Sequence, residues 1–299
     1  MSHILCNLDG QIVDAAKATV SVLDRSFLFG DSIYEVVRTH RGRLFGVTRH
    51  LARLERSAAR LGFEVPIDGA ELRRRIVDVV AALGATGETY VRIVVTRGMA
   101  SEPNIDPACT VSRPLVVLYA RQLSPPDPRW RTTGLSARVV DVLRNDRRAI
   151  DPAIKSGNYL NNILGLMEAR RHAADIALFL GTQGQLTESE TSNVWLVHGD
   201  RLRTPSLESG ILAGITRDFV LEMLRRDGTA CEECMLTEAD LRSADEVFLT
   251  STVKDVCGIT SLDGIPIGCG EVGPVTRDIG ERFAVELDRL VAAESSTSS

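Results

Sequence analysis

A proline-rich segment divides the chain near its middle. Within residues 122–134, prolines stand at positions 125, 126 and 128. Proline lacks the backbone N–H and fixes φ, so this segment suits neither a helix interior nor a central strand. A chain of 299 residues can form two medium-sized domains. We therefore predict domains at residues 1–121 and 135–299, joined by an interdomain linker at 122–134.

The patterns on either side of this linker mix strands and helices without strict alternation. Strands are predicted by β-branched or apolar runs at 4–13 (a hairpin around Asp9-Gly10), 89–96, 114–119, 135–142, 176–180, 194–197 and 246–250. Helices are predicted at 47–61, 70–83 and 275–293, in a run with apolar positions 160, 163, 164 and 167, and at the end of 210–226, which begins as a glycine-bearing loop. Residues 294–299 have the composition of a disordered tail. This order indicates an α+β or α/β fold and fits neither a TIM barrel nor a Rossmann sheet.

Composition excludes several classes of function. The net charge is −5 and no basic stripe stands out, so we expect no nucleic-acid partner. No apolar run approaches the roughly 18 residues of a membrane span, and the N-terminus does not resemble a secretion signal. Six scattered cysteines in such a chain favour reduced thiols and a cytoplasmic location. Cys231 and Cys234 have CxxC spacing but lack a second ligand pair, so no metal site is predicted.

Lys155 is the first candidate for chemistry. It precedes a turn-prone Ser-Gly-Asn and a run whose apolar positions, at 160, 163, 164 and 167, predict a buried helix. Lysine is rarely buried unless it is paired or used chemically. The alternative is a surface lysine in a loop.

Three further features follow the linker. Gly214 and Thr216 stand at a predicted helix start, where free N–H groups and a hydroxyl suit a phosphate, although an ordinary threonine N-cap has the same pattern. Ser251-Thr252 ends a strand and could complete an anion site or form a turn. Residues 186–193 bring acidic and hydroxyl side chains before a buried strand, or form a solvated loop. A lysine, a phosphate cradle and a carboxylate together suit pyridoxal 5′-phosphate (PLP).

The order of several short motifs resembles the class IV aminotransferases, the PLP fold type IV group. This group includes branched-chain and D-amino acid aminotransferases, (R)-amine transaminases and aminodeoxychorismate lyase. The resemblance covers about residues 8–290. It rests on Phe29-Gly30-Asp31-x-x-Tyr34-Glu35, His50-Leu51-x-Arg53-Leu54, Lys155-x-Gly-Asn158-Tyr159, Leu186-Thr187-Glu188 with Ser192-Asn193-Val194, Leu212-x-Gly214-Ile215-Thr216-Arg217, and Thr250-Ser251-Thr252.

The resemblance implies a small α+β N-terminal domain, a larger domain with a mixed, barrel-like sheet, and PLP as cofactor. Lys155 would form the Schiff base and move protons, Glu188 would pair with the pyridine nitrogen, and Tyr159 would hydrogen-bond the phenolic oxygen. The implied phosphate contacts are Arg53, Ile215, Thr216 and Thr252. The other implied cofactor contacts are Ser192, Asn193, Gly214 and Ser251. Arg53 would reach the cofactor, although the helical pattern alone puts it on a polar face.

The resemblance also implies a ping-pong transfer between an amino donor and a 2-oxo acid, in a homodimer. The implied substrate-pocket residues are Tyr34, Arg38, Tyr90, Arg92 and Val253. Glu102 and Asn104 replace the Arg-x-His pair of D-amino acid aminotransferases, which favours a branched-chain-like substrate.

Other features of the sequence keep rival functions open. Tyr34-Glu35-Val36-Val37 looks more like the D-amino acid group, so a D-amino acid or (R)-amine transaminase is the alternative. A PLP lyase of the aminodeoxychorismate type is a further one. A non-enzymatic relative is disfavoured because Lys155 and Glu188 are both present.

Overall fold

The chain forms two compact units in a computed structural model that describes residues 3–296. The first unit contains Met1–Pro125, Ile154–Tyr159 and Arg289–Ser299, and the second contains Pro126–Ala153 and Leu160–Asp288. The short stretch around Lys155 therefore belongs to the first unit, whereas the expected boundary assigned it to the larger C-terminal domain.

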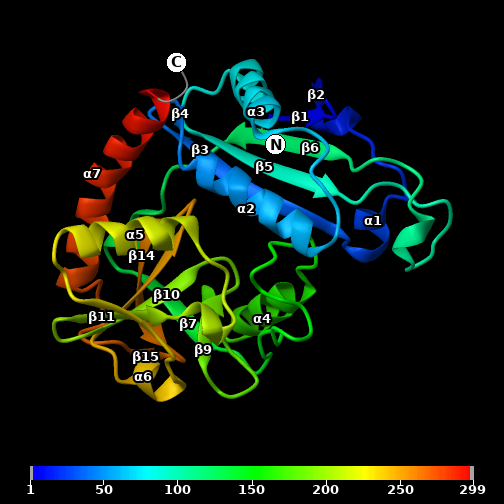
Figure 1. Cartoon of the computed structure of the whole chain (residues 1–299). Helices are drawn as coiled ribbons and strands as arrows, with labels where there is room; N and C mark the ends of the chain where they lie inside the picture. The colour runs from blue at the N-terminus through cyan, green and yellow to red at the C-terminus, as the bar shows by residue number, and fades with distance from the viewer. Residues whose placement is uncertain (1–2, 297–299) are drawn as a thin grey trace. The chain divides into compact units, whose positions relative to one another are not determined.

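The first unit is built on a six-stranded antiparallel sheet of order β2-β1-β6-β5-β3-β4 (Figure 1). Its strands are β1 (Ile4–Leu8), β2 (Gln11–Asp14), β3 (Ser32–His40), β4 (Arg43–Leu44), β5 (Thr89–Thr96) and β6 (Val116–Gln122). The predicted hairpin between β1 and β2 is confirmed: Asp9 and Gly10 both have positive φ, and the Gly10 N–H donates to Asn7 Oδ1 at 2.8 Å.

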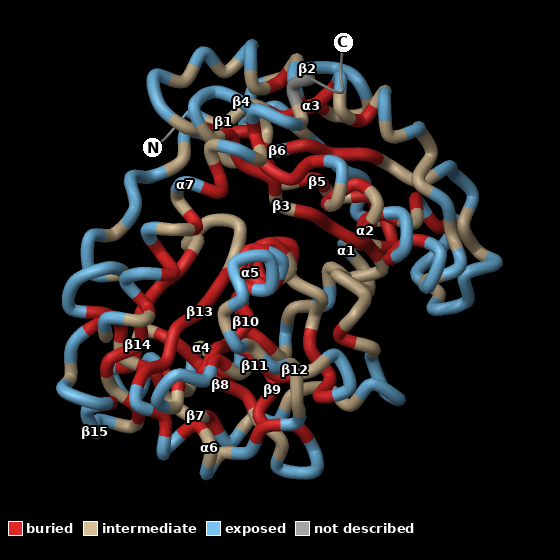
Figure 2. The backbone as a smooth tube through the Cα atoms, turned by 60° about the vertical axis from the view of Figure 1, so that its left-hand side comes forward, coloured by how far each residue is buried: buried red, intermediate tan, exposed pale blue. Residues whose placement is uncertain are grey.

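Two amphipathic helices cover one face of this sheet. The helices of the unit are α1 (Arg25–Phe29), α2 (Val47–Arg60) and α3 (Gly69–Leu83), with 3-10 turns η1 (Ala15–Lys17) and η2 (Pro107–Cys109). The α3 helix starts where Asp68 accepts the N–H of Glu71 and ends at left-handed Gly84. Apolar residues of α2 and α3 pack on alternate residues of β3, β5 and β6 to form the core. Figure 2 shows these strands as buried.

The second unit contains a nine-stranded mixed sheet. Its strands are β7 (Leu135–Val139), β8 (Ile176–Leu180), β9 (Leu186–Ser189), β10 (Asn193–His198), β11 (Arg201–Pro205), β12 (Cys231–Cys234), β13 (Glu246–Ser251), β14 (Asp255–Leu262) and β15 (Ile265–Pro266). The order is β12-β11-β10-β13-β14-β7-β8-β9, and β9 pairs back to β10 at Glu188 and Asn193. Six strands thus close into a barrel, with parallel pairs at β7–β8 and β7–β14. The expected mixed, barrel-like sheet is confirmed.

The helices of this unit are α4 (Leu160–Arg171), α5 (Ile215–Arg226) and α6 (Glu238–Arg242), with 3-10 turns η3 (Pro128–Arg131) and η4 (Leu207–Ser209). The last helix, α7 (Pro274–Ser296), contributes residues to both units. It continues through 294–296, where a disordered tail was expected, and residues 297–299 of that tail lie outside the described residues.

The prediction that α4 buries its apolar side chains is wrong. The buried residues of α4 are Asn162, Gly165 and Ala169. A Cβ at Gly165 would lie 2.3 Å from Cζ of Phe179, so the helix packs closely on β8 through its small side chains. The four apolar side chains of the predicted row are between 44% and 61% exposed; they are Leu160, Ile163, Leu164 and Met167.

Candidate active site

The backbone around Lys155 extends the edge of β3. The Tyr34 N–H donates to the Lys155 carbonyl at 2.9 Å, and the Gly157 N–H donates to the Ser32 carbonyl at 2.7 Å. The Lys155 N–H donates to Ser57 Oγ on α2 at 3.3 Å. The lysine is thus held by β3 and α2 of its own unit.

Aromatic rings surround the amine of Lys155. Its Nζ lies 4.4 Å from the ring centroid of Tyr34 and 6.0 Å from that of Tyr159, and the two rings meet edge to face at 5.3 Å. The guanidinium of Arg92 stacks on the Tyr34 ring at 3.9 Å. Among the described residues of this unit, Lys155 Nζ and Arg92 form no hydrogen bond or ion pair. Both cationic groups therefore have donors to offer a ligand.

Tyr34 is buried between these cations. Burial raises its pKa far above the ordinary value, the neighbouring Tyr159 raises it further, and Arg92 only partly opposes this. The phenol is therefore neutral at physiological pH and can present its ring face to two cations. The structure thus brings together four of the residues expected from the sequence: Lys155, Tyr159, Tyr34 and Arg92.

A buried charged cluster lies on the opposite side of β3. Glu35 accepts from Arg53 Nε at 2.6 Å and from Arg53 Nη2 at 2.8 Å, and its Oε2 lies 2.7 Å from His50 Nδ1. Glu35 and His50 are fully buried, and Arg53 is 5% exposed. The motif around Arg53 predicts a phosphate contact, but it does not reveal the carboxylate partner of Arg53. The alternation of β3, which puts Glu35 on the apolar side with Ile33 and Val37, is the signal that could have identified it.

Electrostatics in this cluster favour a carboxylate and a neutral imidazole. Burial alone would raise the pKa of Glu35, but the charge and hydrogen bonds of Arg53, with a contribution from His50, lower it well below its usual range. Burial lowers the pKa of His50, and Glu35 offsets this only in part. The cluster therefore fixes two nitrogens of the Arg53 side chain in a bidentate pair.

The other expected substrate residues of this unit, Arg38 and Tyr90, share with Arg92 the face of the sheet that α2 and α3 leave uncovered. Arg38 pairs in register with Tyr90, and Arg92 lies two residues beyond Tyr90 on the same face. Arg38 is buried, with its guanidinium 5.7 Å from the Phe45 ring centroid, while the Tyr90 ring lies 4.6 Å from the guanidinium carbon of Arg121. Of Arg38 and Arg92, Arg92 is therefore the one whose side-chain N–H donors make no hydrogen bond to a described residue of this unit.

Arg97, the residue after β5, has partners within its own unit. Its Nε donates to Asp31 at 2.6 Å, Nη2 donates to the Leu61 carbonyl at 2.8 Å, and its guanidinium lies on the Phe63 ring. Of the nearby positions that replace the Arg-x-His pair, Glu102 is exposed and accepts a 3.3 Å hydrogen bond from Asn104.

In the second unit, Glu188 lies on β9 at the seam of the barrel. Its Oε1 accepts from Arg144 Nη2 at 2.8 Å, and its Oε2 accepts the Leu212 N–H at 3.0 Å and Asn193 Nδ2 at 3.4 Å. Glu188 and Asn193 are both buried. Their burial excludes the alternative of a solvated loop and fits a cofactor contact. The sequence analysis did not identify Arg144.

The start of α5 has the features of an anion site. Gly214 is the N-cap and makes no side-chain capping bond, so the alternative of an ordinary threonine cap is wrong. Thr216 is 2% exposed and its Oγ1 has no hydrogen-bond partner within the described part of the chain. A Cβ at Gly214 would lie 1.9 Å from Asn193 Oδ1, so only glycine fits this approach. Together with Ile215, the first helical residue, these groups can bind an anion.

The remaining expected residues lie in or near the turn from β13 to β14. Ser251 ends β13 and its Oγ accepts the Lys254 N–H at 3.2 Å, while Thr252 and Val253 lie in the turn. Lys254 Nζ donates to Ser192 Oγ at 3.4 Å. The side chain of Ser192 is therefore engaged by a lysine that the sequence analysis did not consider.

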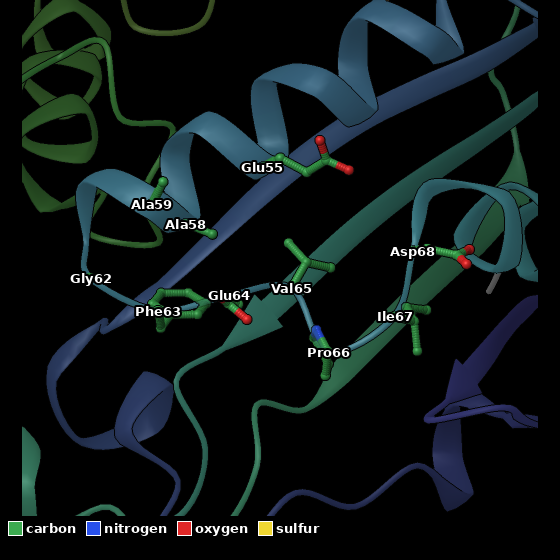
Figure 3. Close-up of a pocket in the computed structure, with 10 residues that line it drawn as sticks. All are labelled: Glu55, Ala58, Ala59, Gly62, Phe63, Glu64, Val65, Pro66, Ile67 and Asp68. Atoms are coloured by element: carbon green, nitrogen blue, oxygen red, sulfur yellow. The ribbon is translucent and has the colours of Figure 1, made fainter.

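Other features of the structure do not coincide with these groups. A cavity of about 650 Å³ lies beside the end of α2. Figure 3 shows its lining, which consists of apolar residues and of Glu55, Glu64 and Asp68. None of the expected site residues lines it. Within residues 3–296, no cluster of three His, Cys, Asp or Glu side chains could hold a metal ion. No helix in that range is both long and apolar enough to cross a membrane.

Comparisons with known proteins agree with this arrangement. The model of the amino-transferase class IV family matches residues 32–262. A putative branched-chain-amino-acid aminotransferase of Methanocaldococcus jannaschii is 33% identical over 276 residues, covering 92% of this chain and 94% of the relative. A D-alanine aminotransferase of Listeria monocytogenes is 33% identical over 284 residues, covering 94% and 96%.

Solved structures of branched-chain aminotransferases have the same fold. The crystal structure of the Escherichia coli branched-chain amino acid aminotransferase has a TM-score of 0.88 and 29% identity, covering 96% of this chain and 94% of that one. The enzyme from Thermobaculum terrenum, solved in its PLP form, has a TM-score of 0.84 and 26% identity, covering 96% and 94%. This chain belongs to the amino-transferase class IV family, has the fold of its type IV PLP enzymes, and is an aminotransferase.

Proposed function

We propose that this aminotransferase moves an amino group between an amino acid with a branched aliphatic side chain and a 2-oxo acid, in two half-reactions. The observation that carries the proposal is the amine of Lys155, which is held between the Tyr34 and Tyr159 rings beside Arg92. An amine that makes no hydrogen bond or ion pair in its own unit is available as a nucleophile.

Each unit, taken by itself, holds residues that fit the family cofactor, PLP, which supplies an electron sink when bound. The orphaned hydroxyl of Thr216 and the N–H groups at the start of α5 suit its phosphate, as does the buried guanidinium of Arg53. Ile215, Ser251 and Thr252 are assigned to the same phosphate. Ser192, Asn193 and Gly214 are assigned to the cofactor contacts around it.

Each remaining group has one task in this proposal. Glu188 would accept a hydrogen bond from the pyridine nitrogen, and Tyr159 would donate one to the phenolic oxygen. Lys155 would hold the cofactor and would carry the Cα proton of the amino donor on Nζ. The kinetics should be ping-pong, because the product of the first half-reaction leaves before the substrate of the second half-reaction binds.

Arg92 is assigned to the carboxylate of the substrate. Its guanidinium is already oriented by the Tyr34 ring, and a charge-assisted pair with a carboxylate needs its unengaged donors. Arg38, Tyr90 and Val253 are assigned to the wall of the pocket. Branched-chain substrates are favoured because Glu102 stands where a carboxylate-binding arginine is expected in the D-amino acid group, and a carboxylate there would repel the substrate.

A donor panel tests this assignment. L-leucine, D-alanine, L-glutamate and (R)-1-phenylethylamine are compared in the wild type and in Arg92→Ala. The acceptor is 2-oxoglutarate for every donor except L-glutamate, which is paired with 4-methyl-2-oxopentanoate so that a net reaction can be followed. We expect L-leucine to be the best donor and Arg92→Ala to reduce kcat/KM for amino acids by about 10- to 100-fold, the loss of 1.4–2.8 kcal/mol, while sparing the simple amine. Equal losses for both classes would show that Arg92 does not bind the carboxylate.

The second candidate is a D-amino acid or (R)-amine transaminase. It is favoured by Tyr34-Glu35-Val36-Val37 on β3, where the branched-chain pattern has a different sequence, and by a D-alanine aminotransferase relative as similar as the branched-chain one. Preference for D-alanine or for the amine in the same panel would support it. Pyruvate formation without any acceptor would instead indicate a lyase.

The covalent role of Lys155 has its own test. Borohydride reduction of the wild type should attach the cofactor to the peptide that contains Lys155, as read by mass spectrometry. Lys155→Ala should release all cofactor on dialysis after the same treatment, and turnover at the wild-type rate by this variant would refute the assignment.

A homodimer and a cytoplasmic location complete the proposal. The homodimer is supported by the exposed apolar residues of α4, a set that solvent would disfavour on a free surface: Leu160, Ile163, Leu164 and Met167. Met167→Glu should shift the sedimentation mass toward the monomer, and an unchanged dimer would exclude α4 from the interface. The location is supported by six free cysteines.

A further inference from the structure

Arg144 is the charged partner of Glu188, and neither the sequence motifs nor the proposed cofactor contacts account for it. Arg144 Nη2 donates to Glu188 Oε1 at 2.8 Å, and the side chains are 12% and 7% exposed. The Arg144 N–H also donates to the Leu180 carbonyl of β8 at 2.8 Å. The guanidinium is therefore presented to Glu188 from backbone that is tied to the barrel.

The rest of the Arg144 side chain is held by two asparagines of α4. Its Nη1 donates to Asn161 Oδ1 at 3.2 Å and to Asn162 Oδ1 at 3.0 Å. The amide nitrogen of Asn162 donates to the Glu190 carbonyl at 2.8 Å, which fixes the orientation of that side chain. These neutral acceptors position Arg144 without competing for its charge, so Glu188 is its carboxylate partner.

The hydrogen bonds to Glu188 come from one charged donor and two neutral ones. The two neutral donors, the Leu212 N–H and Asn193 Nδ2, both reach Oε2. Donors around a carboxylate favour its ionised form, and a cation at hydrogen-bond distance favours it much more than a neutral amide does. Arg144 therefore supplies the net charge that balances Glu188 in this buried part of the unit.

We propose that Arg144 keeps Glu188 ionised when the pyridine nitrogen of the cofactor is bound to it, so that the shared proton resides on nitrogen. This inference rests on the proposed role of Glu188. Burial of two opposite charges is costly, and a neutral carboxylic acid beside a neutral pyridine would avoid that cost. The cation of Arg144 stabilises the carboxylate and shifts the balance toward the protonated nitrogen. One proton is involved throughout, and only its position between Glu188 Oε and the nitrogen changes.

Arg144 is thus a positioning residue, since it touches Glu188 and not the cofactor. A merely structural arginine would affect folding or cofactor affinity but would leave the protonation state of the bound pyridine unchanged. The readout that separates the two roles is the ¹⁵N chemical shift of PLP labelled at the ring nitrogen, bound to the full-length protein. That shift distinguishes a protonated from an unprotonated pyridine without any measurement of turnover.

Four variants are compared with the wild type. Arg144→Met removes charge and hydrogen bond, Arg144→Gln keeps an N–H donor without the charge, and Arg144→Lys keeps the charge. The matched control is Arg226→Met, which removes another arginine from a buried carboxylate, Glu286, at 2.9 Å. We expect the wild type, Arg144→Lys and the control to give the signal of a protonated nitrogen. In Arg144→Gln and Arg144→Met, the ¹⁵N chemical shift should move toward that of an unprotonated ring nitrogen. The displacement in Arg144→Met should be at least as large as that in Arg144→Gln.

Two results would overturn the proposal. One is a protonated signal in Arg144→Gln, which retains the polar contacts and is the variant to rely on if Arg144→Met does not fold. The other is an equal displacement in Arg226→Met. Glu188→Gln separates this inference from the proposed function: if it leaves the wild-type signal unchanged, the assignment of Glu188 to the pyridine nitrogen fails as well. If Glu188→Gln displaces the signal and the Arg144 variants do not, only the role of Arg144 is refuted.

Discussion

Replacement of Glu35 by glutamine tests the buried cluster of the first unit. Glu35 is fully buried and compensates the guanidinium of Arg53, which is 5% exposed, through two hydrogen bonds of 2.6 and 2.8 Å. Glutamine preserves the shape and one acceptor oxygen but removes the charge. Breaking a buried ion pair from one side costs about 3–5 kcal/mol because the remaining charge stays buried. Since glutamine retains one hydrogen bond, we expect a loss of about 3 kcal/mol, at the low end of that range.

Thermal unfolding measured by circular dichroism provides the assay. At about 2–4 °C per kcal/mol for a unit of this size, the melting temperature should fall by roughly 6–12 °C. The matched control is Glu71→Gln on α3. Glu71 also pairs with Arg74 and Arg75, and hydrogen bonds from these arginines lower its pKa to about 2. Its side chain is 30% exposed, and those of Arg74 and Arg75 are 60% and 11% exposed. Solvent screens the pair with Arg74, so we expect a smaller fall in melting temperature than for Glu35→Gln.

The comparison of the two variants decides the question. If Glu35→Gln melts at the same temperature as Glu71→Gln or higher, burial does not increase the cost of removing the carboxylate from the Glu35–Arg53 pair. The reasoning from desolvation would then be refuted.

Further predictions concern pH, packing and thiol chemistry. The pKa values of His50 and Glu35 are lowered in the folded protein, so the unfolded chain binds these protons more readily. The free energy of unfolding should therefore decrease as pH falls below about 6.5, because of His50, and decrease again below about 4.3, because of Glu35. Urea midpoints that stay constant from pH 7 to 5 would contradict the effect of His50. Gly165→Ala should destabilise by about 1–3 kcal/mol because its methyl group would overlap the Phe179 ring; an unchanged denaturation midpoint would show that the ring can move. Burial raises the pKa of Cys257 to about 12, so iodoacetamide at pH 8 should label this thiol only in unfolded protein, as read by mass spectrometry.

Local patterns predicted the elements of the fold well, because the causes of those elements lie within a few residues of one another. The Asp9-Gly10 turn, the α2 stripe and the Gly84 helix end all follow from side chains that the pattern itself contains. The same reasoning failed for α4. Its apolar row is plain in the sequence, but which face packs depends on Gly165 meeting Phe179, a residue of a later strand.

The charged partners in the site were missed for a related reason. Patterns treat charged residues as solvent-facing, whereas Glu35 and Arg53 are buried because each neutralises the other across 18 positions. Arg144 and Glu188 are 44 positions apart and meet only when β8 and β9 are in place. Resemblance to a family identified Arg53 and Glu188 by their motifs. It did not identify their partners, since no motif carried them.

The barrel of the second unit closes at the Glu188–Asn193 pair of β9 and β10. Closure also requires β7 to pair with β14, more than 100 positions later in the chain. The carboxylate assigned to the cofactor therefore stands at the joint of the ring, and its three donors assemble around it only when the ring is complete. A chain that has not finished folding has no such acid in place. The second unit can therefore contribute this contact to the cofactor only after its barrel has closed. The fraction of protein that retains cofactor is then expected to follow the fraction that is correctly folded.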